Sequence, residues 1–215
     1  MKIGVLGTGM VGSAIASKLV SLGHEVKMGS REAGNEKGRR WAAAAGAGAS
    51  AGTFAEAAKF GEIVFSATLG EAAIEALQAA GKENLRGKVL VDVSNPLDFS
   101  RGMPPTLFTA AAGDSLAERI QKAFPDAKVV KALNTVNAGV MTDPARVHGE
   151  SDLFVSGNDA DAKEKVAALL RSFGWRSILD LGDITGARGQ EAYLLLWLRL
   201  YTVLKTADIN IKVVR

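Results

Sequence analysis

The chain has 215 residues, of which 47% are hydrophobic, and its 26 basic and 23 acidic side chains leave a formal net charge of +3. This length corresponds to one large domain or to one and a half ordinary domains. The opposite charges are interspersed, and neither a basic arm nor an aromatic-interleaved basic patch occurs, so we expect no binding of nucleic acid.

The chain contains no cysteine, which excludes disulfides, thiolate nucleophiles and cysteine metal sites. Such a composition is typical of a cytoplasmic protein. No charged-then-apolar leader precedes Ile3. The most apolar late stretch, 192–204, carries Arg199 and is too short to span a bilayer. We therefore expect a cytoplasmic protein with no membrane partner.

The chain begins with a strand, a glycine turn, a helix and a second strand. Ile3 to Leu6 is a short apolar run, residues 13–22 have a helical pattern, and a strand at 25–28 ends in Gly29-Ser30-Arg31. Strands and helices go on alternating after a polar loop and a short helix at 32–41. Further strands are expected at 62–68, 88–93, 128–133, 152–156 and 176–181. Further helices are expected at 54–60, 71–81, 116–124 and 160–172. This alternation predicts an α/β fold with a Rossmann-type, doubly wound and mainly parallel sheet.

Three segments interrupt this alternation. Residues 42–52 are rich in Ala and Gly and predict no more than a helix end and a turn. Residues 98–114 predict either an irregular loop over the site or a flexible lid. Residues 186–208 predict one long apolar helix, which packs on its own sheet, covers the active-site cleft or forms a subunit interface. We expect a dinucleotide-binding domain at 1–182 and a C-terminal helical segment at 183–215, which forms the second-substrate cleft or a homodimer contact.

The glycine turn, Gly7-Thr8-Gly9-Met10-Val11-Gly12, has the spacing of a dinucleotide site. Gly7 permits a sharp turn out of the strand, Gly9 lets the backbone approach a pyrophosphate, and Gly12 lets the helix pack closely on the strand. The helix N-terminus adds unpaired N–H donors and a partial positive charge, which together hold an anion. The context of a strand–turn–helix–strand unit favours nucleotide binding over an ordinary tight turn.

The end of the second strand indicates which nucleotide binds. Sites that prefer NAD usually carry Asp or Glu about 20 residues past the glycines, bonded to the ribose 2′-hydroxyl. Here Gly29 is followed by Ser30 and Arg31, and Lys37 can add a second cation. A hydroxyl and a guanidinium can bind a 2′-phosphate. We therefore expect NADP(H) as the cofactor.

Polar residues follow three later strands. Ala67-Thr68-Leu69 ends one strand and either flanks the nicotinamide ribose or forms a plain turn. Ser94-Asn95-Pro96 ends the next, where the proline keeps Asn95 out of a helix. The segment Asn134-Thr135-Val136-Asn137 ends a third and predicts a polar site, because ligands bind beyond the carboxyl ends of parallel strands.

The usual groups of hydrolytic and metal chemistry are missing. The chain has two histidines, and no HExxH, GxSxG or P-loop motif occurs. Hydride transfer between two cofactors needs none of these groups, because the protein supplies only placement and exclusion of water. No Ser-x-Tyr-Lys arrangement is present, so reduction of a ring is favoured over reduction of a carbonyl.

Several stretches resemble the NADPH-dependent reductases of the deazaflavin coenzyme F420. These are GTGMVG at 7–12, LGHEVKMGSR at 22–31, ALNTVNA at 132–138, GARGQEAYLLLWLRL at 186–200 and the terminal INIKVV. The nucleotide-binding module also resembles the cytosolic domain of the STEAP ferric reductases.

The resemblance implies a set of binding residues and a second substrate. It implies that Thr8, Ser30, Arg31 and Lys37 contact NADP phosphates, and that the turns at 67–69 and 94–96 flank the nicotinamide. It implies that 134–137 and the segment near Ala187 border the ring of F420. The sequence departs from the family pattern at Met10, Val11, Asn134 and Ala187. Two alternatives therefore remain open: reduction of FMN, FAD, a quinone or a ferric chelate, and an NADPH-binding sensor without catalysis.

Overall fold

A computed structural model describes residues 1–214, and these residues form an eight-stranded sheet and a two-stranded hairpin. The strands of the large sheet are β1 (Lys2–Leu6), β2 (Glu25–Ser30), β3 (Ala49–Thr53), β4 (Ile63–Ser66), β5 (Val89–Asp92), β8 (Lys128–Ala132), β9 (Asp152–Gly157) and β10 (Ser177–Asp180). Their order across the sheet is β10-β9-β8-β5-β4-β1-β2-β3. The strands from β8 to β3 are mutually parallel, whereas β9 runs antiparallel to β8 and β10 runs parallel to β9. The expected doubly wound, mainly parallel fold is confirmed.

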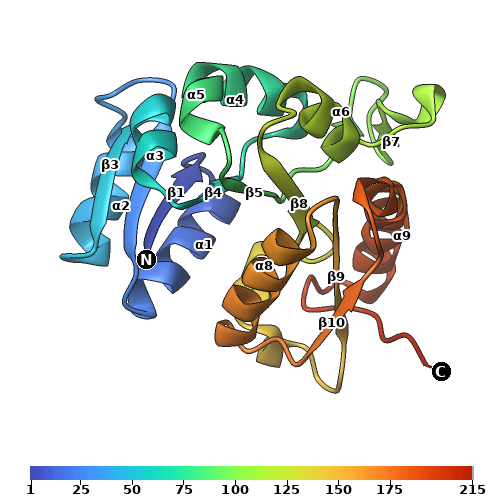
Figure 1. The fold of residues 1–215 in the computed structure, drawn as a ribbon. Helices are drawn as coiled ribbons and strands as arrows, with labels where there is room; N and C mark the ends of the chain where they lie inside the picture. Colours follow the sequence, from blue (N-terminus) through green and yellow to red (C-terminus); the bar gives the residue numbers. More distant parts are fainter. Residues whose placement is uncertain (215) are drawn as a thin grey trace.

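Helices cover both faces of the sheet (Figure 1). One core joins the sheet to α1 (Met10–Ser21), α2 (Glu36–Ala45), α7 (Ala138–Thr142) and α8 (Ala160–Ser172). The other joins it to α3 (Phe54–Phe60), α4 (Ala73–Ala80), α5 (Lys82–Leu85), α6 (Leu116–Ala123) and the start of α9 (Ala187–Leu204). The capping boxes at Thr53 and Ser115 both form, each with a glutamate three residues on.

The structure corrects several expected boundaries. The segment 42–52, interpreted as a helix end and turn, also contributes most of β3, which pairs in parallel with β2 at the sheet edge. This strand was missed because its sequence, ASAGT, has no apolar run. Helix α1 begins at Met10 rather than at residue 13, and α9 ends at Leu204 rather than at residue 208.

The segment 97–112 is more ordered than a loop. It contains a short hairpin, β6 (Leu97–Asp98) with β7 (Thr106–Leu107), followed by the 3-10 helix η2 (Ala110–Ala112). Further 3-10 turns are η1 (Gly70–Ala72), η3 (Pro144–Arg146) and η4 (Ile184–Gly186). A lid at residues 98–114 stays a prediction.

The last helix, α9, packs beside α6 and β9, and the chain end then passes the start of β9 (Figure 1). The backbone N–H of Asp152 donates to the carbonyl of Ile211 at 2.9 Å. Within residues 1–214, none of the helices has both the length and the hydropathy that crossing a membrane requires.

Candidate functional site

Five turns meet at one edge of the sheet. Strands β2, β1, β4, β5 and β8 are parallel neighbours, so the turns that follow them lie side by side at their carboxyl ends. These turns contain all the expected binding segments except Lys37 and Ala187: residues 7–12, 30–31, 67–69, 94–96 and 134–137. The chain order reverses between β1 and β4, and open α/β sheets bind ligands at such a switch point.

Packing within the protein explains two of the three motif glycines. Gly7 has φ +123°, and a Cβ there would lie 2.4 Å from the carbonyl oxygen of Ala67. A Cβ on Gly12 would lie 2.1 Å from the carbonyl oxygen of Gly7. By contrast, a Cβ on Gly9 would meet no atom of the described residues within 4 Å. The space above Gly9 therefore suits close approach by a ligand.

The N-terminus of α1 has the properties of an anion site. Its N-cap is Gly9, which supplies no side-chain hydrogen bond, and no acidic residue lies in the first turn. The first N–H groups of the helix therefore point outward together with the positive end of its dipole. Thr8 is half-buried and Val11 is partly buried, whereas the side chain of Met10 is 80% exposed. These residues fit a pyrophosphate.

Two cations follow β2: Arg31 lies in the turn itself, and Lys37 lies in the first turn of α2. Arg31 and Lys37 are exposed, and Arg31 lies 3.8 Å from the carboxylate of Glu75 across the turn. Ser30 is buried instead, and its hydroxyl donates to the carbonyl of Glu32 at 2.6 Å. The hydroxyl of Ser30 could donate to a phosphate only if it rotated away from the carbonyl of Glu32. The two cations are already exposed to an incoming phosphate.

The turn after β4 carries an unpaired polar atom. Oγ1 of Thr68 is buried and has no hydrogen-bond partner among residues 1–214. Buried polar groups normally have a partner, so this hydroxyl suits a ligand. Ala67 is buried against the glycine turn, and the neighbouring Leu69 is 73% exposed. An apolar side chain beside a free hydroxyl matches a ribose–nicotinamide unit.

The turns after β5 and β8 are joined to each other. The side-chain amide of Asn95 donates to the carbonyl of Asn134 at 3.0 Å, and the amide of Asn134 donates to Oδ1 of Asn95 at 3.0 Å. Ser94 and Pro96 are buried, and the hydroxyl of Ser94 donates to Asp92 at 2.6 Å.

The residues expected to border the second ring are mostly internal. Asn134 and Thr135 are each 1% exposed, and Val136 is 5% exposed. The second N–H of Asn134 donates to the carbonyl of Gln190 at 3.0 Å, so both of its amide hydrogens are used. Asn137 caps α7, accepts from the backbone N–H of Gly139, and donates to the carbonyl of Ala207.

Ala187 is also internal. Its side chain is fully buried in the same core as Ile184 and the start of α6. The structure therefore brings 134–137 and α9 together, but mainly through contacts within the protein. A direct contact of these side chains with a ligand stays a prediction.

A buried charged cluster centred on Lys131 lies against the turn at 94–96. Nζ of Lys131 is 2.8 Å from Oδ2 of Asp92, 2.9 Å from Oε1 of Glu191 and 2.6 Å from the carbonyl oxygen of Ser94. Burial by itself lowers the pKa of Lys131, but the two carboxylates outweigh burial and hold the pKa above its ordinary value.

Sequence reasoning missed this cluster, although the sequence carries a signal for it. Asp92 stands three residues before Asn95, and Lys131 stands three residues before Asn134. Opposite charges at equivalent places in two adjacent strands predict a pair, and the sheet register does place Asp92 beside Lys131. The third member, Glu191, comes from a distant helix with no local signal.

Three comparisons with known proteins identify relatives of this chain. A family model described as "NADP oxidoreductase coenzyme F420-dependent" matches residues 2–96. A crystal structure of a candidate F420-dependent NADP reductase from Arthrobacter sp. FB24 is 51% identical, covers 100% of both chains and has a TM-score of 0.94. The F420-dependent NADP reductase of Methanothermobacter marburgensis is 29% identical over 98% of both chains.

The chain belongs to the F420-dependent NADP reductase family. It is also 31% identical over 89% of its length to the metalloreductase STEAP3 of Rattus norvegicus, but it spans only 36% of that protein. The family resemblance inferred from the motifs is therefore confirmed.

Proposed function

We propose that this protein is an NADP(H)-dependent oxidoreductase that transfers hydride between NADPH and the deazaflavin coenzyme F420. The observation that carries the proposal is the shared sheet edge, where the uncapped α1 and the Arg31 turn lie beside the turns of β4, β5 and β8. Full-length similarity to members of the F420-dependent family supports the identity of the second substrate.

Each turn has a defined task in this proposal. The N–H groups around Gly9 and Met10 bind the pyrophosphate, and Arg31 with Lys37 binds the 2′-phosphate. Thr68 and the turn at 94–96 orient the nicotinamide half. The two rings supply the reacting carbons, and the protein aligns them at about 3–3.5 Å and excludes water.

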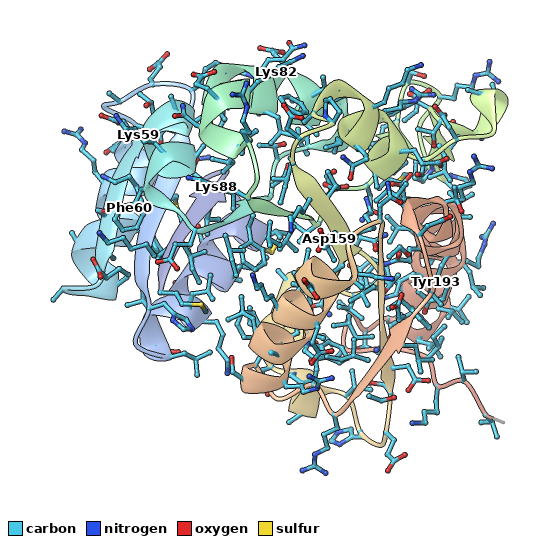
Figure 2. All side chains as sticks on the ribbon, in the orientation of Figure 1. Lys59, Phe60, Lys82, Lys88, Asp159 and Tyr193 are labelled. Atoms are coloured by element: carbon cyan, nitrogen blue, oxygen red, sulfur yellow. The ribbon has the colours of Figure 1, made fainter. Side chains whose placement is uncertain are left out.

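Helix α9 carries two side-chain donors that can bind a second ring beside the nicotinamide. The hydroxyl of Tyr193, labelled in Figure 2, and Nε1 of Trp197 are buried without a hydrogen-bond partner among the described residues. They lie one helical turn apart on α9, and burial raises the pKa of Tyr193. Two unpaired donors suit the carbonyl and nitrogen acceptors of a deazaflavin.

We further propose that residues 183–215 act as a separate functional segment and that the protein is a cytoplasmic homodimer. Several large apolar side chains of α9 are exposed: Leu195, Leu196, Tyr201, Val203 and Leu204. A second copy that covers this face would remove them from water. Light scattering during size-exclusion chromatography should give twice the mass of the chain, and a monomer mass would contradict the dimer.

A second candidate is reduction of a different acceptor, which the similarity to the metalloreductase STEAP3 favours. The test is an anaerobic assay with NADPH and a panel of F420, FMN, FAD, a quinone and a ferric chelate. The proposal expects turnover of F420 at least about tenfold above every other acceptor. Faster reduction of another acceptor would reassign the substrate, and tight NADPH binding without turnover would indicate a sensor.

A further inference from the structure

Lys131 is the centre of a fully paired buried cluster. Its side chain is 0% exposed, and a lysine ammonium has three N–H donors. All three have acceptors: Asp92, Glu191 and the carbonyl oxygen of Ser94. The last of these belongs to the turn that is expected to hold the nicotinamide.

Glu191 connects this cluster to two helices. Its carboxylate, which is 1% exposed, accepts from the backbone N–H groups of Leu116 at 2.8 Å and Ala117 at 3.1 Å. These N–H groups form the start of α6, where the helix dipole favours a negative charge. Lys131 and Glu191 together therefore tie β8, the Ser94 turn, α6 and α9 to one another.

The neighbouring Gln190 strengthens the same junction. It is 2% exposed, its backbone carbonyl accepts from Asn134, and its side-chain amide donates to the carbonyl of Phe154 at 3.1 Å. Two consecutive residues of α9 are thus held at the carboxyl ends of β5 and β8 and beside the amino-terminal half of the antiparallel β9. The turn at 134–137 contacts Gln190 directly, and the turn at 94–96 is joined to it through the Asn95–Asn134 pair.

Stability alone does not account for such a cluster. Burying three charges costs several kcal/mol per ion, and well-packed apolar residues often stabilise a core as well or better. The backbone beside it is also strained, because the buried Leu133 has φ +63° in the left-handed region. Strain of this kind typically lies at functional sites.

We propose that Lys131 is a positioning residue for hydride transfer. Its ammonium fixes the Ser94–Asn95 turn directly, and through Glu191 it fixes α9, so that the nicotinamide and the second ring keep one separation. The inference rests on the proposed function. Hydride transfer is sensitive to this separation, because a misplacement of about 1 Å can cost about 100-fold in rate.

The test compares Lys131→Met with a matched control, Lys88→Met. Lys88 also donates to backbone carbonyls, those of Ala58 and Lys59, but Figure 2 shows it far from α9. For Lys131→Met we expect kcat to fall about tenfold or more while KM for NADPH changes less than about threefold. Lys88→Met should lower the thermal midpoint and leave kcat at 25 °C unchanged.

A second measurement does not depend on the acceptor. The fluorescence lifetime of bound NADPH reports how firmly the nicotinamide is held, and it should shorten in Lys131→Met but not in Lys88→Met. If wild-type protein binds NADPH but reduces no F420, the proposed function fails while this lifetime comparison still tests the positioning role. Unchanged kcat and an unchanged lifetime in folded Lys131→Met would overturn the inference.

Lys131→Met leaves two buried carboxylates without a counter-charge and can fail to fold. The variant Lys131→Met/Glu191→Gln removes one charge of each sign and keeps the net charge of the cluster. It should show the same loss of kcat and the same shorter lifetime. If both variants fail to fold, or if the double variant retains wild-type kcat, the cluster serves stability and the positioning role is wrong.

Discussion

Asn95 and Asn134 exchange two hydrogen bonds, each 3.0 Å long, across the carboxyl ends of the adjacent strands β5 and β8. One residue belongs to the turn expected to flank the nicotinamide, and the other to the turn expected to border the second ring. The pair therefore links the two halves of the site through the protein itself, and both turns should move together.

This link predicts non-additive effects of the two single variants. Asn95→Ala breaks both hydrogen bonds, whereas Asn134→Ala breaks only the bond that its side-chain amide donates, because its backbone carbonyl remains. The double variant should therefore lose that shared bond only once. Because one buried hydrogen bond contributes about 0.5–1.5 kcal/mol, the coupling in unfolding free energy should be about 0.5–1.5 kcal/mol. Urea denaturation of the four proteins measures it. Additive effects would show that the two turns are independent.

Gly9→Ala should separate binding from folding. The backbone at Gly9 has φ −79°, which alanine adopts, and a Cβ there meets no described atom. The thermal midpoint should stay the same or rise slightly, because alanine restricts the unfolded chain. The dissociation constant for NADPH should rise about tenfold or more, because the Cβ occupies the pyrophosphate position.

Gly189→Ala is the matched control, since Gly189 also has open space and lies on the exposed side of α9. It should leave the affinity for NADPH unchanged. Wild-type affinity in Gly9→Ala would place the pyrophosphate elsewhere.

Arg31→Ala should raise KM for NADPH about 10- to 100-fold and leave KM for NADH nearly unchanged. Loss of a charge-assisted, bidentate contact costs about 1.5–3 kcal/mol, and only NADPH carries the 2′-phosphate. Glu75→Gln removes the carboxylate that lies 3.8 Å from Arg31 and should keep or lower KM for NADPH. Equal losses with both nucleotides in Arg31→Ala would refute the 2′-phosphate assignment.

The contact between α6 and α9 should weaken in acid. Two hydrogen bonds from the Arg188 guanidinium, at 2.9 and 2.6 Å, hold the pKa of Glu118 below its ordinary value of 4.5. A carboxyl with a lowered pKa stabilises the fold above its ordinary pKa and loses this contribution as the pH falls through the folded-state value. Glu118→Gln should therefore lower the free energy of unfolding by about 0.5–1 kcal/mol at pH 7, and by progressively less below pH 4.5.

Denaturation curves between pH 3 and pH 7 would measure this difference. The control Glu164→Gln breaks an exposed pair with Arg171 and should change stability little at any pH in this range. If wild type and Glu118→Gln differ in free energy of unfolding by the same amount at every pH, the ionised carboxylate of Glu118 is not the cause of that difference.

The sequence predicted the fold well where local patterns determine structure. Apolar runs located β1, β4, β5, β8 and β9, and capping residues located the starts of α3 and α6. Strand β3 was not predicted, because its small residues are ordered by pairing with β2 and not by their own propensity.

The site was predictable only in part, for a related reason. The glycine turn and Arg31 depend on local spacing, and the structure places both at the expected sheet edge. The internal partners of Asn134 could not be predicted, because Gln190 is 56 residues away in sequence. Glu191 is 60 positions from Lys131, so only the folded chain reveals that they meet.

Direct hydride transfer is tested by following a label from one ring to the other. NADPH carrying two deuterium atoms at the nicotinamide carbon that donates hydride is incubated anaerobically in ordinary water with the enzyme and oxidised F420, and the reduced deazaflavin is analysed by mass spectrometry. Direct transfer predicts one deuterium per molecule of reduced F420. Absence of reduction, or reduced F420 without deuterium, would contradict hydride transfer between the two rings.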